Sequence, residues 1–465
     1  MTEYQLTINS LAVLDGIGLH TGKQVAIRLL PAKADTGFIF QRIDLPGKPK
    51  IEALAENVVS TQRGTSIGKN GTIIATIEHL LAAFVGLGID NAIIEINSSE
   101  VPILDGSSAP FVDAIIQAGI KTLPVPRRFL HVQNPIYYQD SEKDTSIKIL
   151  PDSSYSLDVK IDFNSTQIGN QEAGLKEITT FANEIAPCRT FCFLHELEYL
   201  SSSDLIKGGS LNNAIVIAER PVPAKELKRI AKLFNKENVE VRQEGILNNT
   251  ELNFPNEPAR HKLLDVIGDL ALIGRPLLGK VIANKPGHAS NVEFAKKIRQ
   301  MIKDNTKSIA PVYDPDVKPL LNVEQIKGYL PHRHPFLLVD KILKLDENGV
   351  VGLKNVTYDQ YFLQGHFPDE PVFPGVLAIE AMAQTGGVFV LYQKENPQDY
   401  ITYFLKIDNA KFKRKIVPGD TLIIRMELKS PIRRGLCEMH GTGWIGTQLA
   451  VEADMLAQVS LKEGK

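Results

Sequence analysis

Apolar and polar positions in the N-terminal two thirds of the chain form the same pattern twice. Ile77–Ile96 is an apolar stretch, a turn that contains glycine and a second apolar run, which predicts a helix followed by a strand. Arg260–Ala283 repeats this order. Each predicted helix has a histidine near its start, His79 and His261 respectively. A helix and a β-rich run, present twice, predict an α+β fold of two related halves, each a two-layer α/β sandwich.

The C-terminal third predicts a different arrangement, with one long apolar helix among short strands. Gly375–Tyr392 is apolar on nearly all sides, and its only charged residue is Glu380, which predicts a buried helix. Strands are predicted before and after it, at 337–343, 350–357, 403–411, 420–429, 438–445 and 448–461. This order favours one buried helix wrapped by an antiparallel sheet.

Residues 304–320 separate these two parts and are predicted to form a linker. Pro311, Pro315 and Pro319 recur through the segment, and proline blocks both helix and central strand. The predicted organisation is therefore two related halves, a linker and a last domain, at 1–125, 126–303, 304–320 and 321–465.

The composition excludes several classes of protein. The net charge is -2 over 465 residues, whereas obligate nucleic-acid binders usually have a basic surplus. Three cysteines are too few for a disulfide framework, which fits a reducing compartment. The N-terminus lacks the features of a signal peptide, and no apolar run reaches the roughly 18 residues of a membrane span. We therefore expect a cytoplasmic protein that has no nucleic-acid partner and does not insert stably into a membrane.

Residues able to bind a metal are concentrated in the two repeated helices. His261 and Asp265 are four residues apart and so share one helical face, which Asp269 continues. Glu78 and His79 are adjacent, so that one can bind a metal while the other reaches a water molecule on it. Each pattern alone also fits a solvated helix face or helix start. A polar stripe on so apolar a helix is, however, costly to bury without a partner.

A third element is the loop Gly287–Ser290, which contributes His288 after a predicted strand. Taken alone, a loop histidine usually faces solvent. Taken together, two histidines and one aspartate leave an open fourth position on tetrahedral zinc, as in catalytic sites. Glu78 as general base and His288 as proton donor or oxyanion stabiliser complete the inventory for amide hydrolysis.

The motifs between residues 4 and 303 resemble those of UDP-3-O-acyl-N-acetylglucosamine deacetylase, an enzyme of lipid A synthesis. They are Thr76–His79, Gly86–Asn91, Pro102–Gly106, Arg189–Phe191, His261–Asp265 and Gly287–His288. The resemblance implies hydrolysis of the acetamide of UDP-3-O-[(3R)-3-hydroxyacyl]-N-acetylglucosamine. It also implies that Zn2+ is bound by His79, His261 and Asp265.

The same resemblance assigns roles to the neighbours of these ligands. Glu78 is expected to activate water, and His288 to act as the acid, with Asp269 as its supporting partner. Further roles are expected of Thr190, Lys262 and Phe191. The threonine would help to polarise the scissile acetamide, and the other two would contact the substrate.

Three further segments of this part carry expectations. Leu194–Ala218 corresponds to the family's insert that shapes an apolar passage for the acyl chain, for which the suited side chains are Leu197, Tyr199, Leu200, Leu205 and Ile206. The loop 63–66 lacks a cysteine that many family members have there; no proposed catalytic step uses that cysteine, so its absence affects only thiol-directed inhibition. Cys188 and Cys192 lack a partner pair for a metal site, so we expect buried or free thiols.

A second set of reactive residues surrounds the long C-terminal helix. His366 lies in Gly365–Pro368, and Pro374 suits the first turn of the helix. The N–H groups at that turn, Gly375 included, can bind a thioester carbonyl. A lone buried carboxylate such as Glu380 needs a function or a partner, for example a structural hydrogen bond inside a dimer. His366 as base and Glu380 as acid suit elimination from a 3-hydroxyacyl thioester without a cofactor.

The motifs of residues 322–462 resemble (3R)-hydroxyacyl-[acyl-carrier-protein] dehydratase of fatty acid synthesis. They are Leu330–Asp340, Gly365–Pro368, Phe373–Val376 and Glu380–Gln384. The resemblance implies a hot-dog fold in a homo-oligomer, a dimer or a trimer of dimers, whose sites combine His366 of one chain with Glu380 of another. Glutamate rather than aspartate favours the dehydratase type that does not isomerise the double bond. The basic run 411–415 either steers the acidic carrier protein or is a solvated edge.

The sequence thus predicts a bifunctional enzyme, a zinc-dependent N-deacetylase acting on a UDP-sugar followed by a dehydratase acting on acyl carrier protein. One alternative is a deacetylase of another N-acetylated sugar joined to a hot-dog thioesterase. A second alternative is that one half is a non-catalytic acyl-binding or sensing module. Every expected catalytic group is present in both parts, which argues against inert modules.

Overall fold

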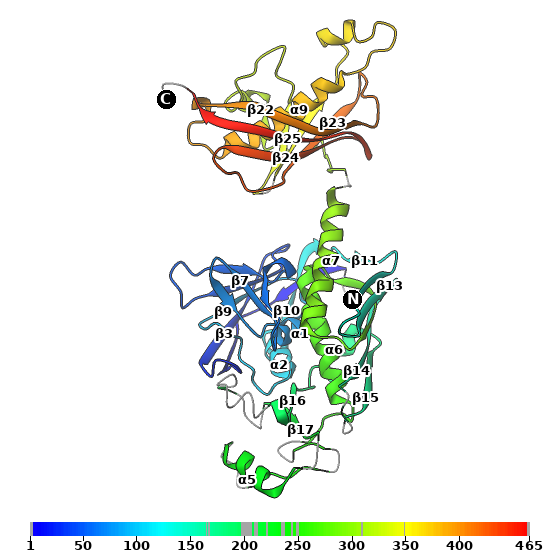
Figure 1. Cartoon of the computed structure of the whole chain (residues 1–465). Helices are drawn as coiled ribbons and strands as arrows, with labels where there is room; N and C mark the ends of the chain where they lie inside the picture. Colours follow the sequence, from blue (N-terminus) through cyan, green and yellow to red (C-terminus); the bar gives the residue numbers. More distant parts are fainter. Residues whose placement is uncertain are drawn as a thin grey trace. The chain divides into compact units, whose positions relative to one another are not determined.

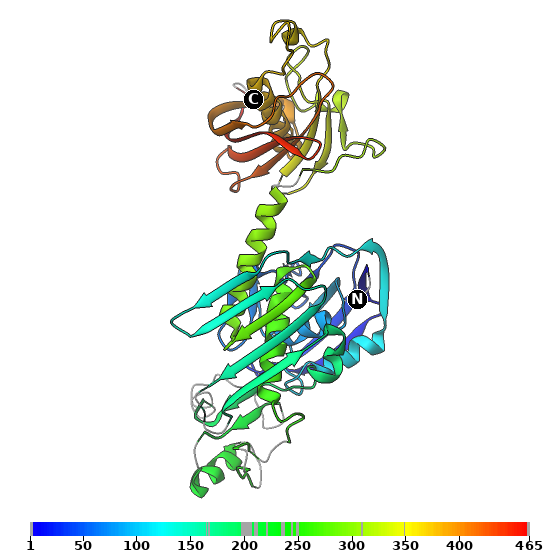
Figure 2. The same cartoon turned by 90° about the vertical axis from the view of Figure 1, so that its right-hand side faces the viewer.

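Two units with separate hydrophobic cores make up the chain in the computed structural model (Figure 1 and Figure 2). The first unit is Met1–Ile302 and the second is Lys303–Lys465. The structure describes residues 3–163, 165, 168–196, 207–208, 213–219, 222–233, 238–242, 245–247, 251–307, 310–347 and 349–462.

Two sheets of the same topology build the first unit. One has the order β2 (Ala12–Ile17), β3 (Gln24–Pro31), β9 (Ala92–Ile96), β4 (Phe38–Arg42) and β5 (Lys50–Glu52). The other has the order β12 (Ile136–Asp140), β13 (Thr145–Leu150), β18 (Leu277–Asn284), β14 (Tyr155–Asp162) and β15 (Asn170–Leu175). In each sheet the central strand is antiparallel to the strand before it in this order and parallel to the strand after it. The predicted duplication is therefore confirmed.

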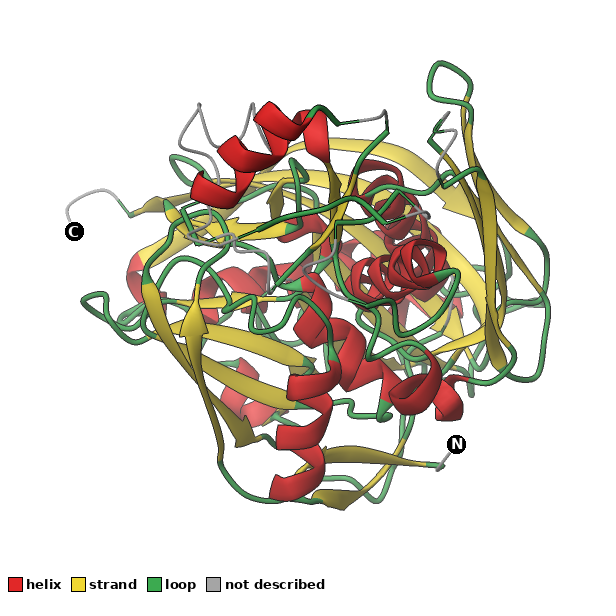
Figure 3. Cartoon of the chain, turned by 90° about the horizontal axis from the view of Figure 1, so that it is seen from below, coloured by secondary structure: helices red, strands yellow, loops and turns green. Residues whose placement is uncertain are grey.

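The helices of this unit lie between the two sheets in Figure 1. They are α1 (Glu78–Gly86), α2 (Ala109–Ala118), α6 (Glu257–Leu270) and α7 (His288–Lys307). Each central strand follows the helix of its own half, α1 before β9 and α6 before β18. Because α6 contacts both α1 and the β14 and β15 strands, the two halves share one core. Helices and strands are both abundant (Figure 3), which confirms the α+β class.

Shorter elements complete the first unit. Strands β1 (Tyr4–Ile8) and β10 (Ile120–Pro126) form a pair, and β11 (Leu130–His131) extends the second sheet. The other small sheets contain β6 (Val58–Ser60), β7 (Ser66–Lys69) and β8 (Thr72–Ile74), and the pair β16 (Phe191–Phe193) with β17 (Ile215–Ile217). The short helices are α3 (Phe181–Glu184) and α5 (Ala224–Leu233).

The α6 helix is buried over nearly its whole length although its sequence is not uniformly apolar. Pro258 stands in its first turn, where a missing N–H costs nothing. The buried residues include His261, Asp265 and Asp269. Charged side chains in such a place need partners, so the packing of this helix already points to a polar site.

The backbones of α6 and α1 approach closely at Gly268. A Cβ atom added at this glycine would lie 2.8 Å from the carbonyl carbon of Glu78 and would meet its carbonyl oxygen more closely still. Real Cβ atoms essentially never make such contacts, so only glycine permits this crossing. The crossing places the first turn of α1 beside the polar face of α6.

The second unit is an antiparallel sheet around one long helix. The strand order is β19 (Leu321–Asn322), β20 (Lys341–Leu345), β21 (Gly349–Asn355), β23 (Thr421–Leu428), β24 (Leu436–Ile445), β25 (Gln448–Leu461) and β22 (Tyr400–Phe412). A short helix, α8 (Val323–Ile326), follows β19. The long helix α9 (Gly375–Tyr392) has the predicted bounds and packs against the sheet.

Among the described residues, α9 is the one helix long and apolar enough to cross a membrane, judged by length and composition alone. Within the unit it is 67% buried, as expected for a core helix. The strand predicted at 337–343 is wrong at its start, because β20 begins at Lys341. Upstream, the Leu338 N–H donates to the side chain of Gln384 at 2.8 Å, so this backbone bonds to α9 rather than to a strand.

The segment predicted as a linker has structure at both ends. The α7 helix extends into it as far as Lys307, and the residues from Lys303 onward belong to the second unit. There the Lys341 Nζ lies 3.3 Å from the Tyr313 hydroxyl and 5.7 Å from the ring centroid. Residues 311–319 also line a cavity together with parts of β20, β21 and β23.

Replacing Gly268 by alanine is expected to force α1 away from α6. The free energy of unfolding of the first unit should fall by about 1–3 kcal/mol, the usual cost of overpacking. Calorimetric unfolding of the full chain measures this change. Gly287→Ala is the matched control, since a Cβ added there meets no atom within 4 Å. Equal stability of the two variants would show that the helices can separate without cost.

Candidate active sites

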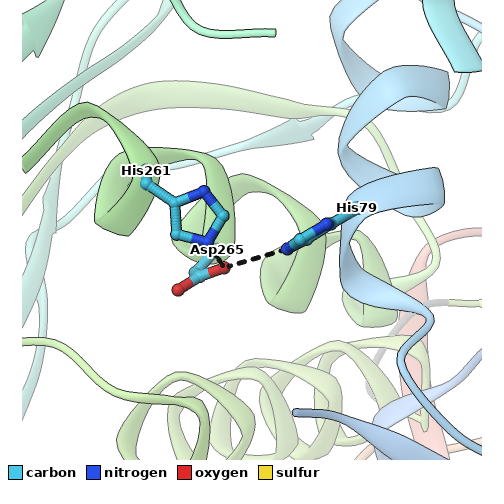
Figure 4. Close-up of side chains that lie close together, drawn as sticks. All are labelled: His79, His261 and Asp265. Carbon is cyan, nitrogen blue, oxygen red and sulfur yellow. Dashed lines mark ion pairs between the residues drawn. The ribbon is translucent and has the colours of Figure 1, made fainter. Parts of the chain in front are cut away.

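Three side chains able to bind a metal meet between α1 and α6. His261 and Asp265 lie one turn apart on α6, and the His261 Nε2 is 3.4 Å from the Asp265 Oδ1. His79, in the first turn of α1, places its Nε2 3.9 Å from the same oxygen (Figure 4). One ligand atom of each residue lies within 4.8 Å of the others, and all three residues are buried. The fold thus brings together the three residues that the sequence nominated.

The donor atoms of this cluster suit a cation. The His261 Nδ1 lies 3.0 Å from the backbone oxygen of Cys188, which fixes the ring with its Nε2 toward Asp265. The rings of His79 and His261 meet edge to face, with centroids 5.0 Å apart. The buried Asp265 Oδ1 has no hydrogen-bond partner within the described part of the chain. A carboxylate oxygen in that position is costly unless a cation binds it.

Electrostatics keep the imidazoles neutral and the carboxylate ionised. Burial, followed by the neighbouring His261, lowers the pKa of His79 to about 3. Burial also lowers the pKa of His261. Burial opposes ionisation of Asp265, but the charge of Lys262 and the histidines outweighs it and holds the pKa of that carboxyl well below its usual range. Neutral histidines with an ionised aspartate form a donor set that zinc accepts.

Glu78 is buried beside the cluster in the first turn of α1. Burial raises the pKa of Glu78 to about 7; His288 opposes this shift and Asp269 adds to it. The Glu78 Oε2 accepts a hydrogen bond of 3.0 Å from the backbone N–H of Thr65. A carboxyl group that titrates near neutral pH can both take up and release a proton.

His288 begins α7 and lies between two carboxylates. Its Nδ1 is 2.9 Å from the Asp269 Oδ2, and its Nε2 is 3.9 Å from the Asp265 Oδ2. Burial lowers the pKa of His288, but the charges of Asp269 and Asp265 outweigh burial and raise it to about 9. The Nδ1 contact with Asp269 leaves the Nε2 available toward the cluster.

Two residues of this site have no role in the sequence prediction. Thr65 and Asn291 are fully buried, and both donate hydrogen bonds to Asp269, from the Thr65 Oγ1 at 2.5 Å and the Asn291 Nδ2 at 2.9 Å. The sequence could have indicated Asn291 as a site residue, because it lies three residues after His288 on the same helix. Thr65 carries no such signal. It belongs to the loop 63–66, which the sequence singled out only for its missing cysteine.

The predicted substrate contacts lie in two places around the cluster. The Lys262 Nζ is 3.0 Å from the Asp265 Oδ2 and 5.7 Å from the ring centroid of Phe191. The Phe191 ring is 6.3 Å from that of His261. Thr190 precedes this phenylalanine and is held through its backbone, whose N–H donates to the Gly106 carbonyl at 2.8 Å. Lys262 and Phe191 therefore adjoin the metal-binding residues.

The predicted acyl-passage insert is described only in part. Its five nominated residues, Leu197, Tyr199, Leu200, Leu205 and Ile206, lie outside the described residues. At its edge the rings of Phe163, Phe191 and Phe193 pack together, with centroids between 5.4 and 6.2 Å apart. All three cysteines of the chain are free, and Cys188 is buried.

In the second unit, Glu380 is held by its neighbour one turn along α9. The Gln384 Nε2 donates to the Glu380 Oε1 at 2.9 Å and to the Phe336 carbonyl at 2.8 Å. The Gln384 Oε1 in turn accepts from the Leu338 N–H. The amide is thereby fixed at both ends, and the carboxylate that it orients is half-buried.

A cavity of about 270 Å³ lies beside Glu380, and its lining is mostly apolar. His332 also lines it and places its Nε2 3.6 Å from the Glu380 Oε1. Its ring stacks on Phe336, with centroids 6.2 Å apart. The prediction missed this histidine as a site residue, although it stands inside the motif Leu330–Asp340.

His366 and Gly375 lie apart from this cavity lining. The His366 Nδ1 is 2.8 Å from the Val372 carbonyl, which leaves the Nε2 for chemistry. Gly375 opens α9, and a Cβ added there would lie 2.6 Å from the ring of Phe412. In the described part of one chain, no hydrogen bond or ion pair joins His366 to Glu380. The proposed sharing of this site between two chains stays a prediction.

Comparison with known proteins assigns both units. The family model for UDP-3-O-acyl N-acetylglycosamine deacetylase matches residues 5–234 and 224–300, and that for the FabA-like domain matches residues 330–454. The bifunctional enzyme LpxC/FabZ of Bacteroides thetaiotaomicron is 46% identical over 455 residues, 98% of both chains. This chain belongs to the bifunctional LpxC/FabZ family.

Two other curated relatives agree with membership of the LpxC/FabZ family. The bifunctional enzyme LpxC/FabZ of Chlorobaculum tepidum is 42% identical over 468 residues, 100% of both chains. The UDP-3-O-acyl-N-acetylglucosamine deacetylase of Syntrophotalea carbinolica is 42% identical over 296 residues, 63% of this chain and 87% of the relative. A chain of the dehydratase heterocomplex ApeI:P from Xenorhabdus doucetiae is 21% identical and covers 31% of this chain and 93% of its own length, with a TM-score of 0.27.

Membership of the LpxC/FabZ family accounts for the two cores. The deacetylase family model covers the duplicated first unit, and the FabA-like model covers the unit built around α9. The predicted fold class, a duplicated α/β sandwich followed by a hot-dog fold, is therefore confirmed.

Proposed function

We propose that this chain catalyses two reactions, one in each unit. The first unit hydrolyses the acetamide of UDP-3-O-[(3R)-3-hydroxyacyl]-N-acetylglucosamine with zinc and water. The second unit dehydrates (3R)-hydroxyacyl-[acyl-carrier-protein] to the trans-2-enoyl form without a cofactor. The observation that carries the first assignment is the buried cluster of His79, His261 and Asp265, flanked by Glu78 and by His288.

Zinc fits the donor set of the first unit. Two neutral imidazoles, an ionised aspartate and an unpartnered buried Asp265 Oδ1 match a catalytic site with one position left open. When bound, zinc supplies a Lewis acid that polarises the acetamide carbonyl and lowers the pKa of a bound water molecule. The neighbouring His261–Cys188 contact supports the ligand geometry by fixing the imidazole tautomer.

The proton transfers fall to the residues around these ligands. Glu78 takes the proton of the attacking water, from a position fixed by the Thr65 N–H. His288 gives a proton from its Nε2 to the departing amine, with its Nδ1 held by Asp269. A base and an acid held by separate hydrogen bonds can act in sequence on one substrate.

The substrate contacts remain those assigned by resemblance. Lys262 offers a cation beside the cluster, and Phe191 offers an apolar ring against His261. Thr190 would help to polarise the scissile acetamide. Lys262 also contacts Asp265. The same side chain would therefore contact both the substrate and a proposed metal ligand.

Removal of the metal is expected to abolish deacetylation and to leave dehydration unchanged. Chelation of the full chain and the His79→Ala change should each lower the deacetylation rate by more than roughly 100-fold, since even residues that only orient metal ligands cost 10–100-fold when removed. Elemental analysis of bound zinc accompanies the rate assays. His131→Ala, at an exposed histidine of the same unit, is the control. Deacetylation that is indifferent to chelation would contradict the zinc assignment.

Thr65 connects the base with the acid. Its backbone N–H donates to Glu78, and its hydroxyl donates to Asp269 at 2.5 Å and lies 3.4 Å from the His288 Nδ1. We therefore assign it a positioning role: the hydroxyl fixes the carboxylate that holds His288. Threonine is fully buried here, so water cannot replace the missing donor.

The Thr65→Val change retains the shape of the side chain but removes this hydroxyl. The kcat of deacetylation is expected to fall roughly 10- to 100-fold, the effect of losing about 1.5–3 kcal/mol from a hydrogen bond to a charged group. KM and zinc content should change little. Thr65→Ser restores the donor and should restore most of the rate. A valine variant as active as the wild type, or a serine variant as slow as valine, would rule out the positioning role.

The dehydratase assignment rests on Glu380, fixed by Gln384 beside a largely apolar cavity. His366 is proposed to remove the C2 hydrogen, and Glu380 to protonate the departing hydroxyl. The N–H of Gly375, at the start of α9, would polarise the thioester carbonyl. In the described part of one chain, no hydrogen bond or ion pair joins His366 to Glu380, which supports a site shared by two copies.

The β22 strand offers the surface for such a second copy. It is the last strand of the sheet and pairs only with β25 among the described residues. Five of its large apolar side chains are exposed: Tyr403, Phe404, Leu405, Ile407 and Phe412. A long apolar edge strand is unfavourable in water and readily pairs with another chain. A homo-oligomer, either a dimer or a trimer of dimers, and a cytoplasmic location complete the proposal.

The basic run near the end of β22 gives only weak support for docking of the acidic carrier protein. Lys411 and Lys413 both pair with Glu452, at 3.1 and 3.2 Å. The other two cations of the run pair with Asp420 and Glu370. Because nearly all of its charge is balanced within the chain, attraction for a carrier protein would be weak at this place.

Two inactive dehydratase variants are expected to restore activity when they are mixed. His366→Ala and Glu380→Gln should each lose dehydration, whereas the co-expressed variants should regain about a quarter of it, because half of random dimers are mixed and each mixed dimer has one intact site. The same variants should retain deacetylation. A mixture as inactive as its components would place both residues of a site on one chain.

A further inference from the structure

A cavity of the deacetylase unit lies apart from the residues assigned to the reaction. Its volume is about 360 Å³, and His79, His261 and Asp265 do not line it. Segments of both halves of the unit form its walls: the start of β4, the end of α1, the end of α6 and the residues before β18. Its size falls in the range of sites for small organic ligands.

Four arginines line this cavity, and one of them has no partner. Arg127 pairs with Asp90 at 2.9 Å, and Arg128 pairs with Asp35 at 3.1 Å. The third, Arg299, pairs with Glu56. Arg275, between α6 and β18, makes no ion pair or hydrogen bond within the described residues. A guanidinium group has five donors, so this one has its full capacity available.

The surroundings of Arg275 are positive. Burial, followed by the charges of Arg128 and Arg299, lowers the pKa of Arg275. Three acids also line the cavity, and none of them makes an ion pair with Arg275 among the described residues: Asp35, Glu52 and Asp90. Three guanidinium groups near one another, one of them unpaired, favour an anion over a neutral ligand or a cation.

Apolar side chains make up part of the remaining lining, beside polar ones such as Gln5 and Asn91. Phe38, Leu54 and Val85 come from the first half, and Leu270 and Leu277 come from the second. The Phe38 ring stacks on that of Phe84, with centroids 4.9 Å apart. Apolar walls and a few placed polar groups are the usual composition of a small-molecule site.

We propose that this cavity binds a small amphipathic anion, with its carboxylate or phosphate group on Arg275 and its apolar body against these side chains. Guanidinium binds both groups through paired hydrogen bonds. Because residues of both halves line the cavity, the ligand would hold the halves together without contact with the metal cluster. It would therefore act on stability and on the relative positions of α1 and α6, and not on the chemistry directly.

Calorimetric titration of the full chain at low ionic strength tests this proposal. The probes are phenyl phosphate, benzoate and, as the neutral comparison, benzyl alcohol. One anion is expected to bind at one site per chain, and Arg275→Gln should weaken that binding about tenfold through loss of the charged pair. Glu52→Gln should strengthen it, because it removes the opposing charge. The stronger of the two anions identifies the preferred head group.

Arg28→Gln is the matched control. Arg28 is an exposed residue of β3 that does not line the cavity. Its replacement removes the same charge, and this variant should bind the anion as the wild type does. Four outcomes would overturn the proposal. They are absence of anion binding, equal binding by Arg275→Gln, equal binding of benzyl alcohol, and loss of binding after chelation, which would place the anion at the metal-binding residues. Since Arg275 is only partly buried and makes no ion pair or hydrogen bond within the described residues, its replacement is expected to leave the fold intact.

Discussion

The contact between α1 and α6 is the constraint on which the first unit depends. Gly268 lets the two backbones meet, and that meeting puts Glu78 and His79 beside the polar face of α6. The cost of burying so many polar groups is offset only because each has a fixed partner or a ligand position. Burial in turn shifts the pKa values of these groups away from their ordinary values. The packing of the two helices therefore also sets the protonation states on which the chemistry depends.

The network around Asp269 shows how far this dependence extends. The carboxylate is fully buried, and its contacts come from the 63–66 loop through Thr65 and from α7 through His288 and Asn291. Two segments distant in sequence are therefore fixed by one side chain of α6. A change in either of them would move the proposed proton donor relative to the proposed base, although neither contains a proposed metal ligand.

Local pattern predicted much of this structure, and tertiary contacts account for what it missed. The duplication, the α9 bounds and the grouping of His79, His261 and Asp265 follow from periodicity and motif spacing. Thr65 could not be found in this way, because its backbone and hydroxyl meet their partners only after the loop folds over α1. The start of β20 was misplaced because a side chain, Gln384, takes the place of a neighbouring strand. The predicted roles of the site residues remain proposals.

The duplicated topology has a consequence for how such a site arises. The two sheets have the same strand order, yet the helices contribute unequally: α1 supplies the proposed base and one proposed ligand, and α6 supplies two proposed ligands. A single half would contain only part of the set and would have to pair with a copy of itself to surround a metal. With two such halves in one chain, the two helices can carry different residues. The asymmetry of the catalytic centre is thus a product of symmetry in the scaffold.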